Sequence, residues 1–90
     1  MPYIDSESRQ KFEVAIQMIG QVVIKTPGEL NYILSRIGHL YTIHKGLSYT
    51  TINDVLGAFS GAEKEYYRQV AENYEDDKKK LNGHVSELDK

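Results

Sequence analysis

Two carboxylates in the C-terminal third of the chain, Glu72 and Glu75, come nearest to the spacing of a metal site. Three residues apart, they share one face of a predicted helix, as in helical nucleotide pyrophosphatases that bind magnesium. Such sites need a second acidic set, and the neighbouring predicted helix carries only Glu29. A di-iron site needs Glu-x-x-His motifs on two helices, and the chain has none. The pair therefore predicts a solvated acidic face.

The remaining residues of catalytic type do not form a set. The chain has no cysteine, which excludes disulfides, thiolate zinc sites and cysteine nucleophiles. His39 and His44 differ by five positions, which is not the spacing of helical metal ligands, and His84 lies far from both. No glycine-rich phosphate loop is present. We therefore expect no enzyme activity, no metal site and no cofactor.

Aromatic and basic side chains gather late in the chain. The sequence has seven tyrosines and no tryptophan, and a tyrosine suits a half-buried interface position because its large ring ends in a polar tip. Tyr67, Arg68 and Tyr74, with Lys78 further along, could stack a planar group and pair with an anion. The alternative is that the tyrosines cover a small core and Arg68 pairs with Glu65 or Glu72.

Three helices are predicted to position these side chains. Asp5 or Ser6 can cap the first, over about residues 6–25, in which apolar residues recur at steps of three and four. The β-branched run at residues 22–24 could instead form a strand. The chain offers no partner run for such a strand, so a helix is favoured.

The start of the second helix, over residues 27–45, is the clearest local signal. Residues 26–29 read Thr-Pro-Gly-Glu, which places a hydroxyl at the N-cap, proline at the first helical position and glutamate at the third. Gly46 ends the helix. On this helix, Asn31 and Arg36 offer further hydrogen-bond donors.

The third helix, over about residues 50–82, is the longest and would span roughly 48 Å. Its candidate caps are Ser48, Thr50 and Thr51. Its apolar stripe consists of Ile52, Val55, Leu56, Phe59, Ala62, Tyr66, Val70, Tyr74 and Leu81. The stripe thins after Val70, and an Asn-Gly pair ends the helix. The distal half therefore carries aromatic and charged residues that a core does not need.

Short connections make consecutive helices antiparallel neighbours. The sequence therefore predicts an all-α fold, a three-helix up-down-up bundle with a long third helix. Residues 1–83 would form a single helical domain and residues 84–90 a mobile tail. A chain of 90 residues can build only a small core, and oligomerisation is the usual addition where disulfides and metals are absent. We therefore expect a self-associating protein.

The composition limits the class of partner. A net charge of −2, with 27% charged residues, gives no general attraction to nucleic acid. No apolar run approaches the ~20 residues of a membrane span, and the first residues lack the basic and apolar regions of a secretory signal. We expect a soluble, cytoplasmic protein with no membrane contact and no direct nucleic-acid binding.

A series of motifs runs along nearly the whole chain. They are Pro2-Tyr3-Ile4, Gly28-Glu29-Leu30-Asn31-Tyr32, Tyr49-x-x-Ile52-Asn53-Asp54-Val55-Leu56-Gly57-Ala58, Glu65-x-Tyr67-Arg68, Tyr74-Glu75-Asp76-x-Lys78 and Asn82-Gly83. In these motifs the chain resembles a family of short uncharacterised proteins from phages, bacteria and archaea, whose members end near an Asn-Gly-Asp-Val segment. It departs from the family pattern at His84, where the family has aspartate, and at Gln69, where a second arginine is common. The resemblance implies little about activity, since no chemistry is established for the family.

The resemblance does single out polar residues that a core does not require. Tyr67, Arg68, Tyr74 and Asp76 match the motifs and have no capping role, so they are the leading site residues. The full candidate set for binding a ligand or a partner is Tyr67, Arg68, Tyr74, Asp76, Lys78, Asn31 and Arg36.

These observations leave three hypotheses. The first is a non-enzymatic binding protein that self-associates through the distal half of the third helix, in the manner of a phage accessory protein that blocks a host defence component or sequesters a nucleotide signal. The second is a structural module that docks one protein partner. The third is a metal-dependent nucleotide hydrolase that uses Glu72 and Glu75.

Overall fold

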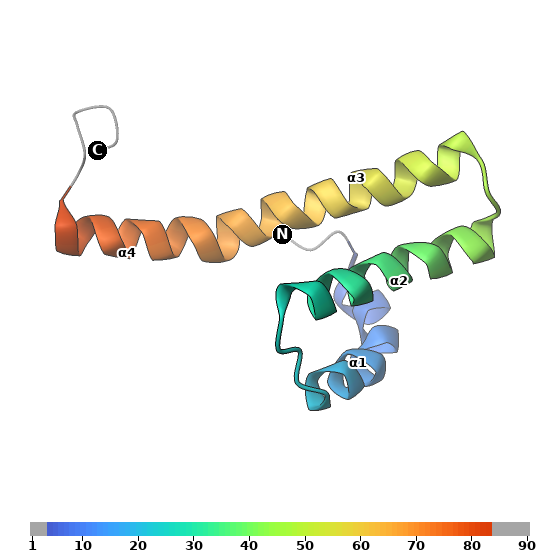
Figure 1. Ribbon diagram of the computed structural model, residues 1–90, viewed down its shortest axis with the longest axis horizontal. Helices are drawn as coiled ribbons and strands as arrows, with labels where there is room; N and C mark the ends of the chain where they lie inside the picture. The colour runs from blue at the N-terminus through green and yellow to red at the C-terminus, as the bar shows by residue number, and fades with distance from the viewer. Residues whose placement is uncertain (1–3, 84–90) are drawn as a thin grey trace. The chain divides into compact units, whose positions relative to one another are not determined.

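The computed structural model describes residues 4–83, and all of their regular structure is helical (Figure 1). No strand occurs within this range, which confirms the all-α class. The elements are α1 (Ser6–Gln21), α2 (Pro27–Lys45), α3 (Tyr49–Tyr66), η1 (Tyr67–Ala71), which is π-helical, and α4 (Glu72–Asn82). The chain divides into two units. One extends to Leu47 and holds α1 and α2, and the other begins at Ser48 and holds α3, η1 and α4.

Helix α1 begins where a side-chain cap satisfies its first free amide. The Asp5 carboxylate accepts a hydrogen bond from the Ser8 amide at 2.7 Å, and this bond lowers the pKa of Asp5. The helix ends at Gln21, so the predicted range of 6–25 is too long. Three successive β-branched residues at 22–24 follow, and such side chains lose rotamer freedom in a helix. They form an extended connection rather than the alternative strand.

Helix α2 has the predicted bounds. The Thr26 hydroxyl accepts from the Glu29 amide at 3.1 Å. The Glu29 carboxylate accepts from the amide of Lys25, the residue before the cap, at 2.9 Å. At the other end Gly46 has a φ of 92°, which favours glycine because it has no Cβ.

The third helix is continuous through its π-helical segment and contains 34 residues, which confirms the predicted long third helix (Figure 1). Of the three candidate caps, Ser48 is the one used, because its hydroxyl accepts from the Thr51 amide at 3.1 Å. The helix ends at Gly83, whose φ is 83° and whose amide donates to the Lys79 carbonyl at 2.7 Å.

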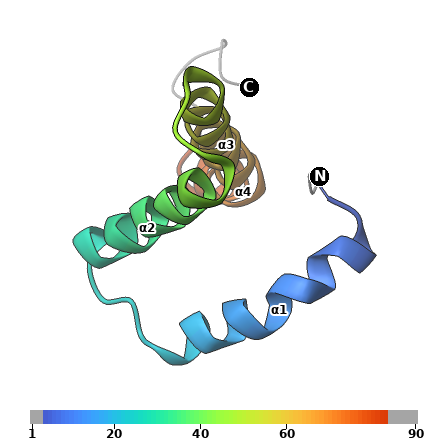
Figure 2. The ribbon, with the colours of Figure 1, turned by 90° about the vertical axis from the view of Figure 1, so that its right-hand side faces the viewer.

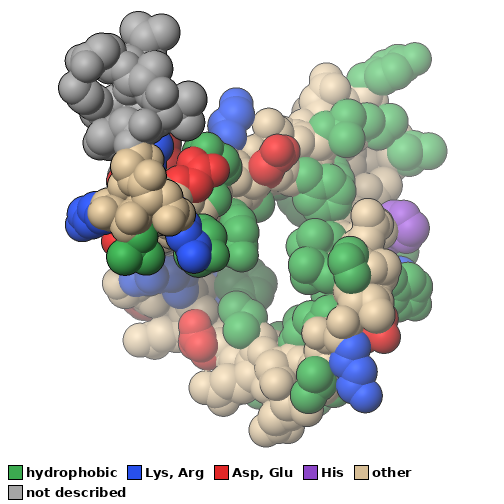
Figure 3. Space-filling model, turned by 60° about the vertical axis from the view of Figure 1, so that its left-hand side comes forward, with side chains coloured by type: hydrophobic (Ala, Val, Ile, Leu, Met, Phe, Trp, Pro, Cys, Tyr) green, Lys and Arg blue, Asp and Glu red, His purple; other side chains and the backbone are tan. Residues whose placement is uncertain are grey.

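Apolar side chains along the described chain remain accessible to solvent. No hydrophobic residue among residues 4–83 is fully buried, and hydrophobic side chains are visible on the surface in Figure 3. Within the first unit, α1 and α2 lie apart (Figure 2), so neither helix covers the apolar stripe of the other. The helices fit the predicted class, an all-α bundle with a long third helix.

Two further expectations stay predictions. The single domain over residues 1–83, with its up-down-up order, depends on how the two units pack together. The mobile tail at residues 84–90 lies outside the described residues.

Candidate functional site

The π-helical segment η1 lies at the start of the polar half of the third helix. The Glu72 amide donates to the Tyr67 carbonyl, five residues back. The Tyr67 amide is shared between the carbonyls of Glu63 and Lys64. A π-helical turn holds one residue more than an α-helical turn, and such turns frequently occur at functional sites. Side chains that follow η1 are therefore rotated about the helix axis, by about one residue, relative to their places in a regular α-helix.

This displacement brings Tyr67 and Glu75 together. In a regular α-helix, residues eight apart point about 80° away from each other. The extra residue in η1 removes most of that difference, and the Tyr67 hydroxyl donates to the Glu75 carboxylate at 3.0 Å. Sequence reasoning placed Glu75 only in an acidic face and missed this contact, since a spacing of eight is not an α-helical neighbour.

The contact changes the chemistry of the Tyr67 hydroxyl. Its pKa is raised, first by the hydrogen bond to Glu75 and then by the negative charge of that carboxylate. A small loss of hydration and the charge of Glu72 act in the same direction. Tyr67 is therefore held as a neutral hydrogen-bond donor rather than prepared as a base.

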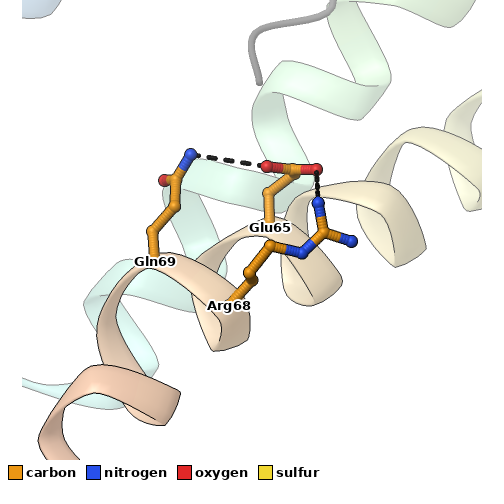
Figure 4. A network of polar contacts seen from close by, with 3 residues as sticks. All are labelled: Glu65, Arg68 and Gln69. Carbon is orange, nitrogen blue, oxygen red and sulfur yellow. Dashed lines mark hydrogen bonds and ion pairs between the residues drawn. The ribbon is translucent and has the colours of Figure 1, made fainter.

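Arg68, the next residue, belongs to a separate polar network (Figure 4). Its guanidinium lies 3.3 Å from one oxygen of Glu65, and the Gln69 amide donates to the other oxygen at 3.4 Å. Of the two glutamates considered as partners for Arg68, the structure pairs it with Glu65. The Arg68 side chain remains 65% exposed while Glu65 is 17% exposed, so the arginine stays accessible to an added anion.

A shallow hollow joins Tyr67 and Arg68 on one side of the helix. Its volume is about 330 Å³ and its lining residues are Glu63, Lys64, Tyr67, Arg68 and Glu72. Two carboxylates, two cations and one phenol thus face a small volume. This mixture suits a ligand or a partner segment that carries both donors and acceptors.

The other candidates on the third helix lie outside the hollow. The Lys78 ammonium lies 5.5 Å from the centre of the Tyr74 ring, which is a cation–π geometry. Asp76 is exposed, one helical turn beyond Glu72. The structure therefore joins Tyr74 with Lys78 and Tyr67 with Arg68, as two separate pairs.

Asn31 and Arg36 lie on α2 in the first unit. The Ser35 hydroxyl donates to the Asn31 side-chain oxygen at 3.2 Å. The Arg36 guanidinium donates to the Tyr32 hydroxyl at 2.6 Å and stacks on the same ring. A second shallow hollow in this unit is lined by Pro27, Gly28, Asn31, Tyr32 and Ser35. Arg36 lies outside it, so Asn31 and Arg36 occupy different surroundings.

Residues 4–83 contain neither a cluster of metal-ligand side chains nor a helix of membrane-spanning type. No group of three or more histidine, aspartate or glutamate side chains there is placed to hold a metal ion. No helix in that range is both long enough and apolar enough to cross a membrane.

Comparison with known proteins assigns the chain to a family. A family model described as a domain of unknown function (DUF6899) matches residues 1–85. The chain belongs to this family. The match covers every element of the structure, including the hollow at η1. No curated protein and no solved structure matches the chain.

Proposed function

We propose that this protein is a non-enzymatic helical binding protein that works as an oligomer. The exposure of apolar side chains carries this proposal, because no hydrophobic residue among residues 4–83 is fully buried. A chain of this size gains little stability from its own core. Burial against other copies is a usual additional source of stability when disulfides are absent.

The hollow at η1 is the proposed binding surface. Arg68 offers an accessible cation for a phosphate, and Tyr67 offers a ring on which a planar base can stack. A small nucleotide signal has both features. In this proposal the protein is a cytoplasmic accessory protein of a phage-type setting, which sequesters such a signal or blocks a host defence component.

The first test is the mass of the full chain in solution. Sedimentation velocity over a range of protein concentrations should show an oligomer. A strict monomer at high micromolar concentration would remove the self-association on which the proposal depends.

The second test addresses the ligand. Calorimetry against cyclic nucleotides and nicotinamide-derived messengers should show binding that is lost in Arg68→Ala and kept in Lys25→Ala, a matched cation in the other unit. If no nucleotide binds the intact chain at high micromolar concentration, sequestration is eliminated.

The alternative function is a structural module that docks one protein partner through the same side chains. It predicts flat nucleotide titrations, together with a pull-down that is lost when Tyr67 and Arg68 are replaced. A metal-dependent hydrolase, the third candidate, predicts magnesium-dependent turnover that is lost on changing Glu72 or Glu75. An activity screen without turnover would remove it.

A further inference from the structure

An apolar seam follows the third helix on a different side from the hollow. Its residues are Phe59, Ala62, Tyr66, Val70, Tyr74 and Leu81. The three steps from Ala62 to Tyr74 are all of four residues, and in a straight α-helix they would rotate the stripe by about 120°. The extra residue of η1 takes up most of this rotation. The seam therefore runs straight through the π-helical turn.

The seam is open to solvent in both halves of the helix. The exposed fractions are 65% for Tyr66, 46% for Val70, 61% for Tyr74 and 78% for Leu81. Steps of three and four along one side form the pattern by which helices pack side by side in coiled coils. A second helix can therefore bury this seam.

Five of the six seam residues are arranged symmetrically about Val70, and Ala62 is the exception, since Lys78 stands at the matching position. Tyr66 and Tyr74 lie four positions before and after it, and Phe59 and Leu81 lie eleven positions before and after it. A two-fold interface requires that residue i of one copy contact residue j of the other, and that j contact i. An antiparallel pair of these helices meets that requirement, with tyrosine on tyrosine and Phe59 on Leu81.

We propose that a second copy of this chain packs antiparallel along the seam, with the two-fold axis at Val70. This inference rests on the proposed self-association and specifies its geometry. The paired stretch, residues 59–81, is about 33 Å long.

Charges beside the seam favour the same arrangement. Glu63 precedes Tyr67 by one turn and Lys78 follows Glu75 by roughly one turn. Since Tyr67 and Glu75 are hydrogen-bonded, all four lie along one flank of the helix. Glu63 is seven positions before Val70 and Lys78 eight positions after it. The two-fold axis therefore places Glu63 of each copy beside Lys78 of the other.

The hollow keeps one side open in this dimer, because only Glu63 and Tyr67 of its lining lie on the flank beside the partner helix. Arg68 and Glu72 lie two positions before and after Val70, which places them on the opposite side of the helix. Each dimer would thus present Arg68 and Glu72 twice, on the sides that face away from the shared seam.

Cysteine cross-linking tests the geometry, because the full chain contains no cysteine of its own. With a short bis-maleimide linker, Val70→Cys should become a covalent dimer. Tyr66→Cys alone and Tyr74→Cys alone should stay uncoupled, whereas a mixture of the two should form the heterodimer. Glu72→Cys, on the far side of the helix, should stay uncoupled and serves as the matched control.

A charge exchange gives an independent measure. Glu63→Lys and Lys78→Glu should each weaken the dimer in sedimentation, and the double variant should recover it. Circular dichroism would verify that each variant keeps its helix content.

The outcomes separate this inference from the proposed function. A strict monomer overturns both. An oligomer in which Tyr66→Cys and Tyr74→Cys each couple with themselves is parallel and overturns only the antiparallel geometry. An oligomer in which Val70→Cys stays uncoupled, or in which the double charge variant fails to recover, also overturns only the geometry.

Discussion

At the scale of the residue, Tyr67 and Arg68 are neighbours in sequence with different roles. The Tyr67 hydroxyl donates a hydrogen bond to Glu75, eight residues away. The Arg68 guanidinium pairs with the carboxylate of Glu65, one helical turn earlier, and most of the Arg68 side chain remains exposed. An exposed ion pair of this kind contributes little stability. The pair therefore serves to orient the arginine rather than to hold the helix together.

The Tyr67–Glu75 bond gives a prediction about pH. The raised pKa of Tyr67 means that the folded chain favours the protonated phenol. The contribution of this bond is fully present below the ordinary tyrosine pKa and is lost as pH rises through the raised pKa. In Glu75→Gln, the pKa of Tyr67 should fall toward the ordinary value. A tyrosine-resolved NMR titration measures this, with Glu13→Gln as the distant control. An unchanged Tyr67 titration in Glu75→Gln would refute the assigned cause.

At the scale of the element, capping residues determine where each helix begins and ends. Replacing the N-cap Thr26 with alanine removes the acceptor for the Glu29 amide. We expect a loss of about 1 kcal/mol in the free energy of unfolding, measured by urea denaturation. Thr26→Ser keeps the hydroxyl and should remain close to the parent. Equal losses of unfolding free energy in both variants would show that the Thr26 hydroxyl is not the source of the stabilisation.

Two glycines allow a matched comparison of backbone effects. Gly46 has a positive φ at the end of α2, whereas Gly57 lies inside α3 with nothing within 4 Å of an added Cβ. Gly46→Ala should destabilise the chain by about 1–3 kcal/mol, because a φ of 92° with a ψ of 144° is a conformation that essentially only glycine adopts. Gly57→Ala should be neutral or stabilise it by up to about 1 kcal/mol, since alanine is the better helix former. The melting temperature should fall in Gly46→Ala and should stay the same or rise in Gly57→Ala. A lower melting temperature in both variants would contradict the assignment.

The π-helical turn is the element-scale feature with the widest consequences. One additional residue in η1 aligns Tyr67 with Glu75 on one side and keeps Tyr66, Val70 and Tyr74 in line on another. The same local change thus serves both the polar hollow and the apolar seam.

At the scale of the whole molecule, the exposed apolar surface ties stability to concentration. If folding and association are coupled, each tenfold increase in protein concentration adds about 1.4 kcal/mol to the apparent stability of a dimer. The melting temperature should therefore rise with concentration. Val70→Asp, which places a charge at the centre of the seam, should abolish this dependence. Tyr49→Asp, at an exposed position outside the seam, should preserve it. A melting temperature independent of concentration in the parent chain would contradict the proposal.

Much of the helical architecture could be read from the sequence. The Thr-Pro-Gly-Glu run at residues 26–29 and Gly46 defined α2 at both ends, because capping and chain reversal depend on local residue types. The end of α1 was placed too late, since its apolar periodicity continued into a β-branched run that does not stay helical. The polar residues of the distal third helix were likewise recognised as unneeded by a core.

The sequence by itself determined the all-α class, the long third helix and the candidate residues on its distal half. The three-dimensional structure decided how those residues group, through contacts within the third helix itself. It placed Tyr67 on Glu75, chose Glu65 over Glu72 for Arg68 and separated Tyr74 and Lys78 from the hollow. The physical reason is the π-helical turn. Face assignments from sequence assume 3.6 residues per turn throughout, and one extra residue shifts every face beyond it.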